Sequence, residues 1–386
     1  MEPKYNPYDL KLIKPDFDSP LTDLIIELEH LRKRDLGGST HPEVFFQLRN
    51  IFHWLESIGS ARIEGNNTTI AEYVETKIDS VPAVRKPNLL EIDNIDDAME
   101  FIEDTVKDFP INKNFVSELH KMVVENLPPP PSGEGDLTPG QYRTHNIKIQ
   151  QSKHLPPDAL LIDGLMEELF AFINSETSPK YDLLKAAIAH HRFVWIHPFG
   201  NGNGRTVRLF TYAMLVKNGL NLNSGRIINP TAVFCSNRNT YYDMLATADS
   251  GKEKDILQWC TYVLRGLKEE IEKIDRFSDY NYLKNEILLP AISFSLERKY
   301  ITNIESKILK KAAELQIIKN EDLKEVLTDK STSQISREIK KLVDKKMLIP
   351  EETGARRYIL RFENNFLLRG VMQILDQKGF LPIKDN

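Results

Sequence analysis

Residues 195–208, WIHPFGNGNGRTVR, carry the side chains best suited to chemistry. Their three glycines at alternate positions permit positive φ angles and let the backbone approach a ligand without interference from a Cβ atom. A helix that begins near Arg205 adds unpaired backbone N–H groups and the positive end of its dipole. Arg205 and Arg208 contribute permanent positive charge. The segment is therefore predicted to bind an anion such as phosphate, with His197 at its mouth as a candidate base.

Other nucleotide and metal motifs fit this chain poorly. A dinucleotide-binding G-x-G-x-x-G that starts at Gly200 would need glycine at position 205, which is arginine, and the element before it has helical rather than strand periodicity. The phosphate-binding G-x-x-x-x-G-K-[ST] is absent, and the histidines at 190, 191 and 197 do not form H-E-x-x-H. The dinucleotide-binding, P-loop and zinc-protease motifs are therefore excluded. The segment is interpreted as a loop between two helices.

The elements that position this loop are predicted to be helices. Residues 1–18 are polar and rich in proline, which predicts an extended arm. Apolar residues then recur at helical spacing, and the second helix is expected to end near Gly59. The predicted helices are 21–31, 41–58, a helix from Thr69, 158–174, 181–195, 206–218 and 254–273.

The C-terminal part has a different pattern. Helices are predicted at 304–315, 321–327 and 333–345, followed by two short strands around a turn at 352–355, which indicates a winged helix-turn-helix. Residues 328–361 carry nine basic and five acidic side chains. This charge fits DNA docking, but it fits a solvated surface or a protein contact equally well. Packing, dimerisation or partner binding is the favoured interpretation.

Composition sets wider limits. The chain has 386 residues, which predicts two or three domains, and 51 basic against 56 acidic side chains give a net charge of −5. A nucleic-acid coat over the whole chain is therefore not expected. Two cysteines, Cys235 and Cys260, exclude a disulfide scaffold and a cysteine-based zinc module. No secretory signal or membrane-spanning run is seen, so a cytoplasmic protein without membrane contact is expected.

The order of residues in the loop resembles the core motif of the Fic family, H-x-F-x-[DE]-G-N-G-R-x-x-R, which fits 197–208 at every fixed position except 201. The resemblance implies a mainly α fold, a Fic-type helical bundle with a small β-hairpin flap, to which the winged helix is added. The expected divisions are an N-terminal helical region at 1–100, a Fic catalytic core at 101–275, a helical linker at 276–299, the winged helix at 300–362, and a C-terminal helix and tail at 363–386.

Fic proteins typically transfer AMP from ATP to a hydroxyl side chain of a target protein. The resemblance therefore implies ATP as substrate, with His197 as the base and Phe199 as a core anchor of the loop. It also implies a set of phosphate-binding residues, with Arg205 on the outer phosphates: Gly202, Asn203, Gly204 and Arg205.

Position 201 departs from the family. Asn201 stands where the family has the acidic ligand of a Mg²⁺ ion. Its amide oxygen can coordinate a metal but brings no charge. We therefore expect Mg²⁺ or Mn²⁺ to be held largely by the nucleotide, with Asn201 as a weak ligand.

A second motif is similar to the inhibitory pattern [ST]-x-x-x-E-[GN] of self-restrained Fic proteins. It consists of Ser60, Glu64 and Gly65 and lies N-terminal to the core. In that class the glutamate pairs with the second arginine of the core motif, here Arg208. A carboxylate on that guanidinium removes a partner of the γ-phosphate, so ATP binds unproductively. The resemblance thus implies an autoinhibited enzyme.

Two further regions complete the expected site. Residues 140–157 resemble the family's flap, a hairpin on which the target protein docks by strand addition. Tyr241 and Tyr242 lie where related proteins contact adenine.

Three functions remain open. The first is autoinhibited protein adenylyltransfer. The second is the reverse chemistry, removal of AMP from a modified protein, in which Glu64 would position a water. The third is a DNA-binding regulator whose Fic core only senses nucleotide, which Asn201 favours and the intact His197 opposes.

Overall fold

The computed structural model describes residues 4–33, 38–78, 86–149, 152–220, 231–352, 354–364 and 366–381. They form two compact units, and each unit gathers separate stretches of the chain. The first unit contains residues 1–35, 53–68 and 84–272, and the second contains 36–52, 69–83 and 273–386. Residues 38–52 and 69–78, placed in the N-terminal helical region from sequence, thus group with the C-terminal residues.

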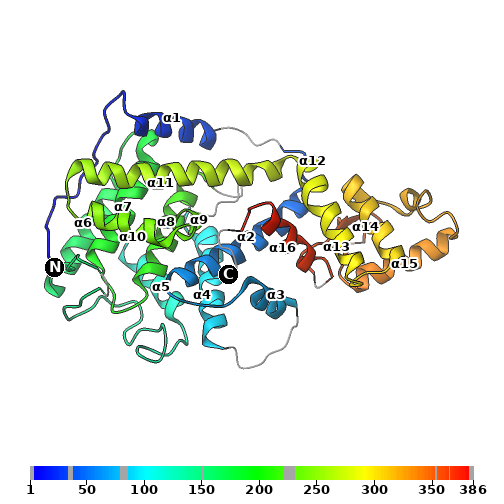
Figure 1. The fold of residues 1–386 in the computed structure, drawn as a ribbon, viewed down its shortest axis with the longest axis horizontal. Coiled ribbons are helices and arrows are strands. Elements are labelled where there is room, and N and C mark those ends of the chain that lie inside the picture. The colour runs from blue at the N-terminus through cyan, green and yellow to red at the C-terminus, as the bar shows by residue number, and fades with distance from the viewer. Residues whose placement is uncertain are drawn as a thin grey trace. The chain divides into compact units, whose positions relative to one another are not determined.

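The first unit is built from helices (Figure 1). Three of them pack against one another: α4 (Pro87–Thr105), α5 (Lys113–Val124) and α8 (Asn203–Lys217). Helix α7 (Asp182–Ile196) packs on α8, and the motif loop joins the two. Both α7 and α8 are buried along almost their whole length. The others are α1 (Pro20–Lys33), the end of α2 (Pro42–Ile63), α6 (Ile162–Asn174), α9 (Thr231–Cys235), α10 (Arg238–Ala248) and α11 (Glu253–Ile274), with 3₁₀ turns at Ala159–Leu161 and Pro179–Tyr181.

Helix α2 runs past the glycine at which we expected it to end. It continues through Gly59 to Ile63, because Ile58, Ala61 and Ile63 are buried and packing outweighs the poor helix propensity of one glycine. The chain leaves the helix at Gly65, whose φ of 108° is accessible mainly to glycine.

The N-terminal residues form the predicted extended arm. Lys4 makes a single parallel β-bridge with His154. The hydroxyl of Tyr8 lies 3.0 Å from Nδ1 of His191, and its ring packs edge-on against Trp195. The arm therefore covers the outer side of α7.

The expected hairpin at 140–157 is not formed within the residues described there, 140–149 and 152–157. These residues run as irregular extended chain, and the only bridge among them is that of His154 with Lys4. The guanidinium of Arg143 donates to the carbonyl oxygens of His145, Pro157 and His197. These bonds replace backbone hydrogen bonds that a β-hairpin would make. A buried arginine with several fixed donors thus satisfies carbonyls that strands would otherwise pair.

The second unit holds the only sheet in the described part of the chain. Strands β1 (Ile317–Ile318), β2 (Leu348–Pro350) and β3 (Tyr358–Leu360) are antiparallel in the order β1-β3-β2, with Ile359 opposite both Ile317 and Ile349. Helices α14 (Asn303–Leu315) and α15 (Thr332–Asp344) pack on it. The helix predicted at 321–327 is only a 3₁₀ turn, Asn320–Leu323.

The remaining helices of this unit surround that core. The predicted linker at 276–299 is a 3₁₀ turn, Asp275–Ser278, followed by α12 (Tyr280–Leu283), a π-helical turn (Lys284–Leu288) and α13 (Leu289–Glu297). Helix α16 (Leu368–Gln377) packs on α13, and α3 (Ile70–Ile78) contacts α16. Gln47, on the first half of α2, hydrogen-bonds the backbone of Leu360 and Phe362.

Within the described ranges, none of the helices combines the length and apolar character that would let it cross a membrane.

Candidate active site

The motif loop leaves α7 at His197 and enters α8 at Asn203. His197 ends α7 in the left-handed conformation, with φ of 53°, and Gly202 caps α8 with φ of 73°. Helix α8 begins three residues earlier than predicted, so Gly204 and Arg205 lie in its first turn. The free N–H groups of that turn face the loop end, as anion binding requires.

Asn203 holds the loop closed. Its Oδ1 accepts from the N–H of Phe199 and its Nδ2 donates to the carbonyl of the same residue, both at 2.9 Å. Phe199 is fully buried, as expected for the core anchor. The side chain of Asn203 is therefore committed to the backbone, and only its main-chain N–H remains for the phosphate contact expected from sequence.

His197 is half-buried and has the protonation state that a base needs. Burial lowers its pKa to about 4, so the imidazole is neutral at physiological pH. Its Nδ1 lies 3.4 Å from the carbonyl oxygen of Val194, which favours the tautomer with the proton on Nδ1. Nε2 then carries the lone pair that can accept a proton.

Two residues outside the motif fix the loop backbone. His120 stacks on Phe199 with ring centroids 3.8 Å apart, accepts from the N–H of Gly140 at Nδ1, and donates from Nε2 to the carbonyl of Asn201. Burial lowers the pKa of His120 to about 4, so it stays neutral in this role. Oδ2 of Asp136 accepts from the N–H of Asn201 at 2.7 Å. Both polar groups of the Asn201 backbone are thus held by side chains.

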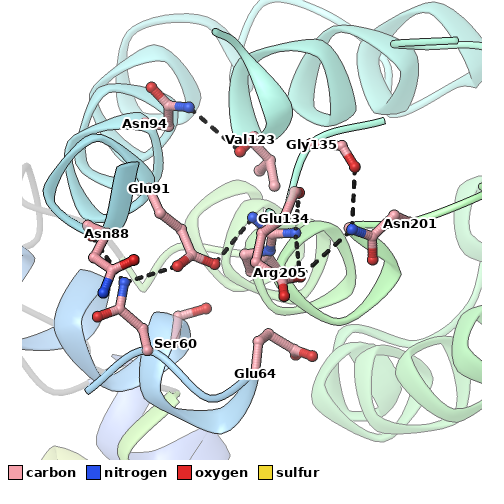
Figure 2. Close-up of polar contacts among 12 residues, drawn as sticks. Ser60, Glu64, Asn88, Glu91, Asn94, Val123, Glu134, Gly135, Asn201 and Arg205 are labelled. Atoms are coloured by element: carbon pink, nitrogen blue, oxygen red, sulfur yellow. Dashed lines mark hydrogen bonds and ion pairs between the residues drawn. The ribbon is translucent and has the colours of Figure 1, made fainter. Parts of the chain in front are cut away.

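Arg205 is buried and surrounded by carboxyl groups (Figure 2). Its Nη1 lies 3.0 Å from Oε1 of Glu91, and its Nη2 donates to the carbonyl of Glu134 at 2.7 Å. The other oxygen of Glu91 accepts from Nδ2 of Asn66, two residues after Glu64. Within the described part of the chain, Nε of Arg205 has no hydrogen-bond partner. A buried guanidinium with an unused donor is suited to an anionic ligand.

Arg208 is held by the predicted inhibitory motif. Its Nη2 donates to Oε1 of Glu64 at 2.8 Å, and its Nε donates to Oγ of Ser60 at 2.8 Å. Because α2 continues to Ile63, Ser60 and Glu64 are one helical turn apart and both reach the same guanidinium. Burial opposes ionisation of Glu64, but the charges of Arg208 and Arg205 outweigh it and hold its pKa below the usual value.

The carboxylate of Glu64 also lies against the phosphate-binding turn. A Cβ atom added to Gly204 would lie only 2.0 Å from Oε1 of Glu64. Glycine at 204 therefore permits a carboxylate, or any other anion, to approach the N-terminal end of α8.

The two tyrosines have different surroundings. Tyr241 is buried in an aromatic cluster with His190, Phe234 and Trp259, and its hydroxyl lies 3.0 Å from Nε2 of His190. Tyr242 is 41% exposed, and the guanidinium of Arg238 lies over its ring. The prediction of adenine contact thus rests on Tyr242, since the ring of Tyr241 is occupied by core packing.

Several residues of this site were missed from sequence: Asn66, Glu91, His120, Glu134 and Asp136. None belongs to either motif, and a lone acidic or amide residue has no spacing that could indicate it. The GEGD run at 133–136 was the one available signal, because glycines on both sides of an acidic residue indicate a tight turn.

Known proteins similar to this chain include the motif loop in the matched region. Residues 110–215 match the Fic/DOC family model. The chain is 29% identical over 239 residues to a protein adenylyltransferase Fic of Nematostella vectensis, covering 60% of this chain and 48% of that one. A protein of the same name from Culex quinquefasciatus is 30% identical over 238 residues, covering 57% and 42%. This chain thus spans less than half the length of these two curated relatives.

A solved structure shares the fold. The crystal structure of a Fic family protein from Desulfovibrio desulfuricans superposes with a TM-score of 0.56 at 19% identity, covering 91% of this chain and 98% of that one. The motif, its helical setting and the family match coincide on the same residues. The segment that matches the Fic/DOC family model thus includes α7 and almost all of α8.

Proposed function

We propose that this protein is an autoinhibited protein adenylyltransferase that transfers AMP from ATP to a hydroxyl side chain of a target protein. The observation that carries the proposal is the loop from His197 to Arg208, which places a neutral histidine beside the N-terminal end of α8. The relatives named as adenylyltransferases support the same activity.

The chemistry follows from these groups. The target hydroxyl gives its proton to Nε2 of His197, its oxygen bonds to the α-phosphorus, and the bond from that phosphorus to the bridging oxygen breaks to release pyrophosphate. The N–H groups at the start of α8 and the arginines 205 and 208 stabilise the charge on the phosphates. Such catalysis depends mainly on position, which the clamps from Asn203, His120 and Asp136 provide.

A divalent cation fits this site only in part. Mg²⁺ or Mn²⁺ bound with ATP would neutralise phosphate charge. Asn201 offers an amide oxygen, and Figure 2 shows that oxygen turned away from the acceptors of its Nδ2. Within the described ranges, no group of three or more His, Cys, Asp or Glu side chains is placed to hold a metal. Asn201 is accordingly proposed as a weak ligand.

Autoinhibition is proposed from the contacts of Glu64. Its carboxylate neutralises Arg208 and lies against Gly204, where a phosphate would have to bind. The Arg208 guanidinium is then unavailable for the γ-phosphate, and ATP cannot adopt the pose in which pyrophosphate leaves in line.

The test uses ATP labelled at the α-phosphate, with Mg²⁺ or Mn²⁺, on the protein alone and on a cell lysate. Glu64→Gly is expected to raise label transfer on the order of 10-fold or more, since a charge-assisted hydrogen bond is worth ~1.5–3 kcal/mol. Adding His197→Ala should lower it by about 10²–10⁴-fold, the usual contribution of a general base.

Two outcomes would contradict the proposal. Transfer that persists in Glu64→Gly/His197→Ala would exclude His197 as the base. Absence of transfer from every variant, together with release of AMP from a modified protein by the wild type and loss of that release in Glu64→Gly, would establish AMP removal instead.

We also propose that residues 303–360 form a winged helix. The order α14, β1, 3₁₀ turn, α15, β2, β3 and the three-stranded antiparallel sheet support it. On α15, Arg337, Lys340 and Lys341 are exposed, but Lys341 pairs with Glu338 and Lys345 pairs with Glu305. These pairs favour dimerisation or a protein partner over DNA. A gel shift with genomic fragments that Arg337→Glu abolishes would reverse that preference.

A further inference from the structure

The departure at position 201 removes a carboxylate from the motif, and the structure places another carboxylate beside it. Oε2 of Glu134 lies 3.4 Å from Nδ2 of Asn201 and 3.5 Å from Nη2 of Arg205. Figure 2 shows the three side chains grouped together. We propose that Glu134 supplies the carboxylate ligand for the divalent cation that accompanies ATP. This inference rests on the proposed function, because it concerns the same nucleotide site.

The backbone fixes the position of Glu134. Its carbonyl accepts from Nη2 of Arg205, the carbonyl of Gly135 accepts from Nδ2 of Asn201 at 3.1 Å, and Asp136 accepts from the backbone N–H of Asn201. Three consecutive residues, 134–136, thus lie alongside the motif loop and bond to it. The placement of Glu134 beside position 201 is therefore a consequence of the fold.

The same turn is too close-packed to move far. A Cβ atom added to Gly133 would lie 2.5 Å from the side chain of Pro128, and one added to Gly135 would lie 2.1 Å from the carbonyl oxygen of Leu127. Glycine on both sides of Glu134 is therefore required by close packing, and the carboxyl group extends from a closely packed turn.

Glu134 is also the accessible carboxylate of this group. Its side chain is 46% exposed, whereas those of Glu91 and Asp136 are 4% exposed. Asp136 is committed to the backbone of Asn201, and Glu91 to Asn66 and Arg205. An ion arriving from solvent with a nucleotide can reach Glu134 without dismantling either of these contacts.

The charges explain why a cation would bind here. Arg205 has an unused Nε donor, which favours an anion, and Glu134 stands next to the same guanidinium. A phosphate on Arg205 would therefore face the negative charge of Glu134. A Mg²⁺ or Mn²⁺ ion between the two removes that repulsion, and one or two carboxylates plus phosphate oxygens are the ligands that Mg²⁺ usually takes.

The competing role for Glu134 is that of a second brake, which would neutralise Arg205 and oppose nucleotide binding. The two roles predict opposite signs. Loss of a metal ligand weakens cation binding to the protein–nucleotide complex, whereas loss of a brake strengthens nucleotide binding.

The experiment measures Mn²⁺ binding by electron paramagnetic resonance. The full chain carrying Glu64→Gly is titrated with Mn²⁺ in the presence of a non-hydrolysable ATP analogue. Adding Glu134→Gln should weaken Mn²⁺ binding on the order of 10-fold or more, since even the partners that orient metal ligands are worth about 10–100-fold. Adding Asn201→Asp to that variant should restore binding, because it returns a carboxylate to the motif.

Glu118→Gln is the matched control. Glu118 lies on α5 of the same unit and its side chain is 47% exposed, so the substitution removes the same charge at similar exposure. Mn²⁺ binding should not change in this control. Unchanged Mn²⁺ binding in Glu134→Gln, or tighter binding of the analogue, would overturn the proposal.

Label transfer from ATP, measured on the same variants, separates the two levels of inference. Mn²⁺ binding that depends on Glu134 without any transfer would leave the ion site standing and contradict the transferase. Transfer by Glu64→Gly that Glu134→Gln does not alter, with unchanged Mn²⁺ binding, would support the transferase and overturn the ion site.

Discussion

The first unit and the second, C-terminal unit use charged residues in different ways. In the first unit, Arg205 and Arg208 are almost fully buried and are paired with Glu91 and Glu64. In the C-terminal unit the pairs lie near the surface. The Lys311–Glu325 pair is 16% and 76% exposed, and Arg369 pairs with a Glu75 that is 44% exposed.

The difference reflects what each region has to do. Burying two guanidinium groups has a high desolvation cost that only closely placed carboxylates or a bound anion offset. A domain selected for stability alone would replace them with apolar residues. The burial of these arginines supports the proposed nucleotide site, whereas the C-terminal unit follows the ordinary pattern of an apolar core with solvated charges.

The largest effect is expected on removal of the buried partner of Arg205. Glu91→Ala should lower the free energy of unfolding by about 3–5 kcal/mol, the cost of leaving one charge of a buried pair uncompensated. All three tryptophans, at 54, 195 and 259, lie in the same unit, so their fluorescence in urea reports this change. A loss below about 1 kcal/mol would show that this pair behaves like a surface pair.

The pH dependence of label transfer tests whether buried His197 titrates differently from an ordinary histidine. An ordinary histidine, with a pKa of about 6.5, would lose roughly tenfold of its basic form between pH 7.5 and 5.5. Burial lowers the pKa of His197 to about 4, so the basic form persists across this range. Label transfer by Glu64→Gly should therefore vary little there.

Loss of stability at low pH limits the range over which label transfer can be measured. His197 and His120 both have a pKa lowered to about 4, so the unfolded chain binds protons first as the pH falls. Their contribution to stability is complete above about pH 6.5 and is lost progressively toward pH 4. Tryptophan fluorescence at each pH distinguishes a drop in transfer caused by unfolding from one caused by protonation of the base, which alone contradicts the prediction.

The smallest effect is expected in the C-terminal unit. Oε1 of Glu75 accepts from Nε of Arg369 at 2.6 Å, but both side chains are partly exposed. Glu75→Ala should therefore cost under about 1 kcal/mol, the usual range for exposed pairs. Thermal unfolding followed by circular dichroism measures it, and a shift as large as that of Glu91→Ala would remove the distinction between the regions.

The sequence by itself determined the main helices and the centre of the site. Periodic apolar residues predicted the helices because each buries one face. The resemblance of two short motifs to those of the Fic family assigned His197, Arg208 and Glu64 to one site, and the Glu64–Arg208 ion pair agrees with that assignment. Helical periodicity, by contrast, acts within a few turns of the chain.

The other features of the fold and of the candidate site depend on tertiary contacts. The tertiary structure extended α2 through Gly59, left the described residues 140–149 and 152–157 without the predicted hairpin, and placed the Asn203 side chain on the backbone of Phe199. It also placed Glu91 on Arg205 and Glu134 beside Asn201. These contacts join residues up to 114 positions apart, taking 91 and 205 as the most distant of these pairs. Burial and desolvation, which no local pattern encodes, determine which of them form.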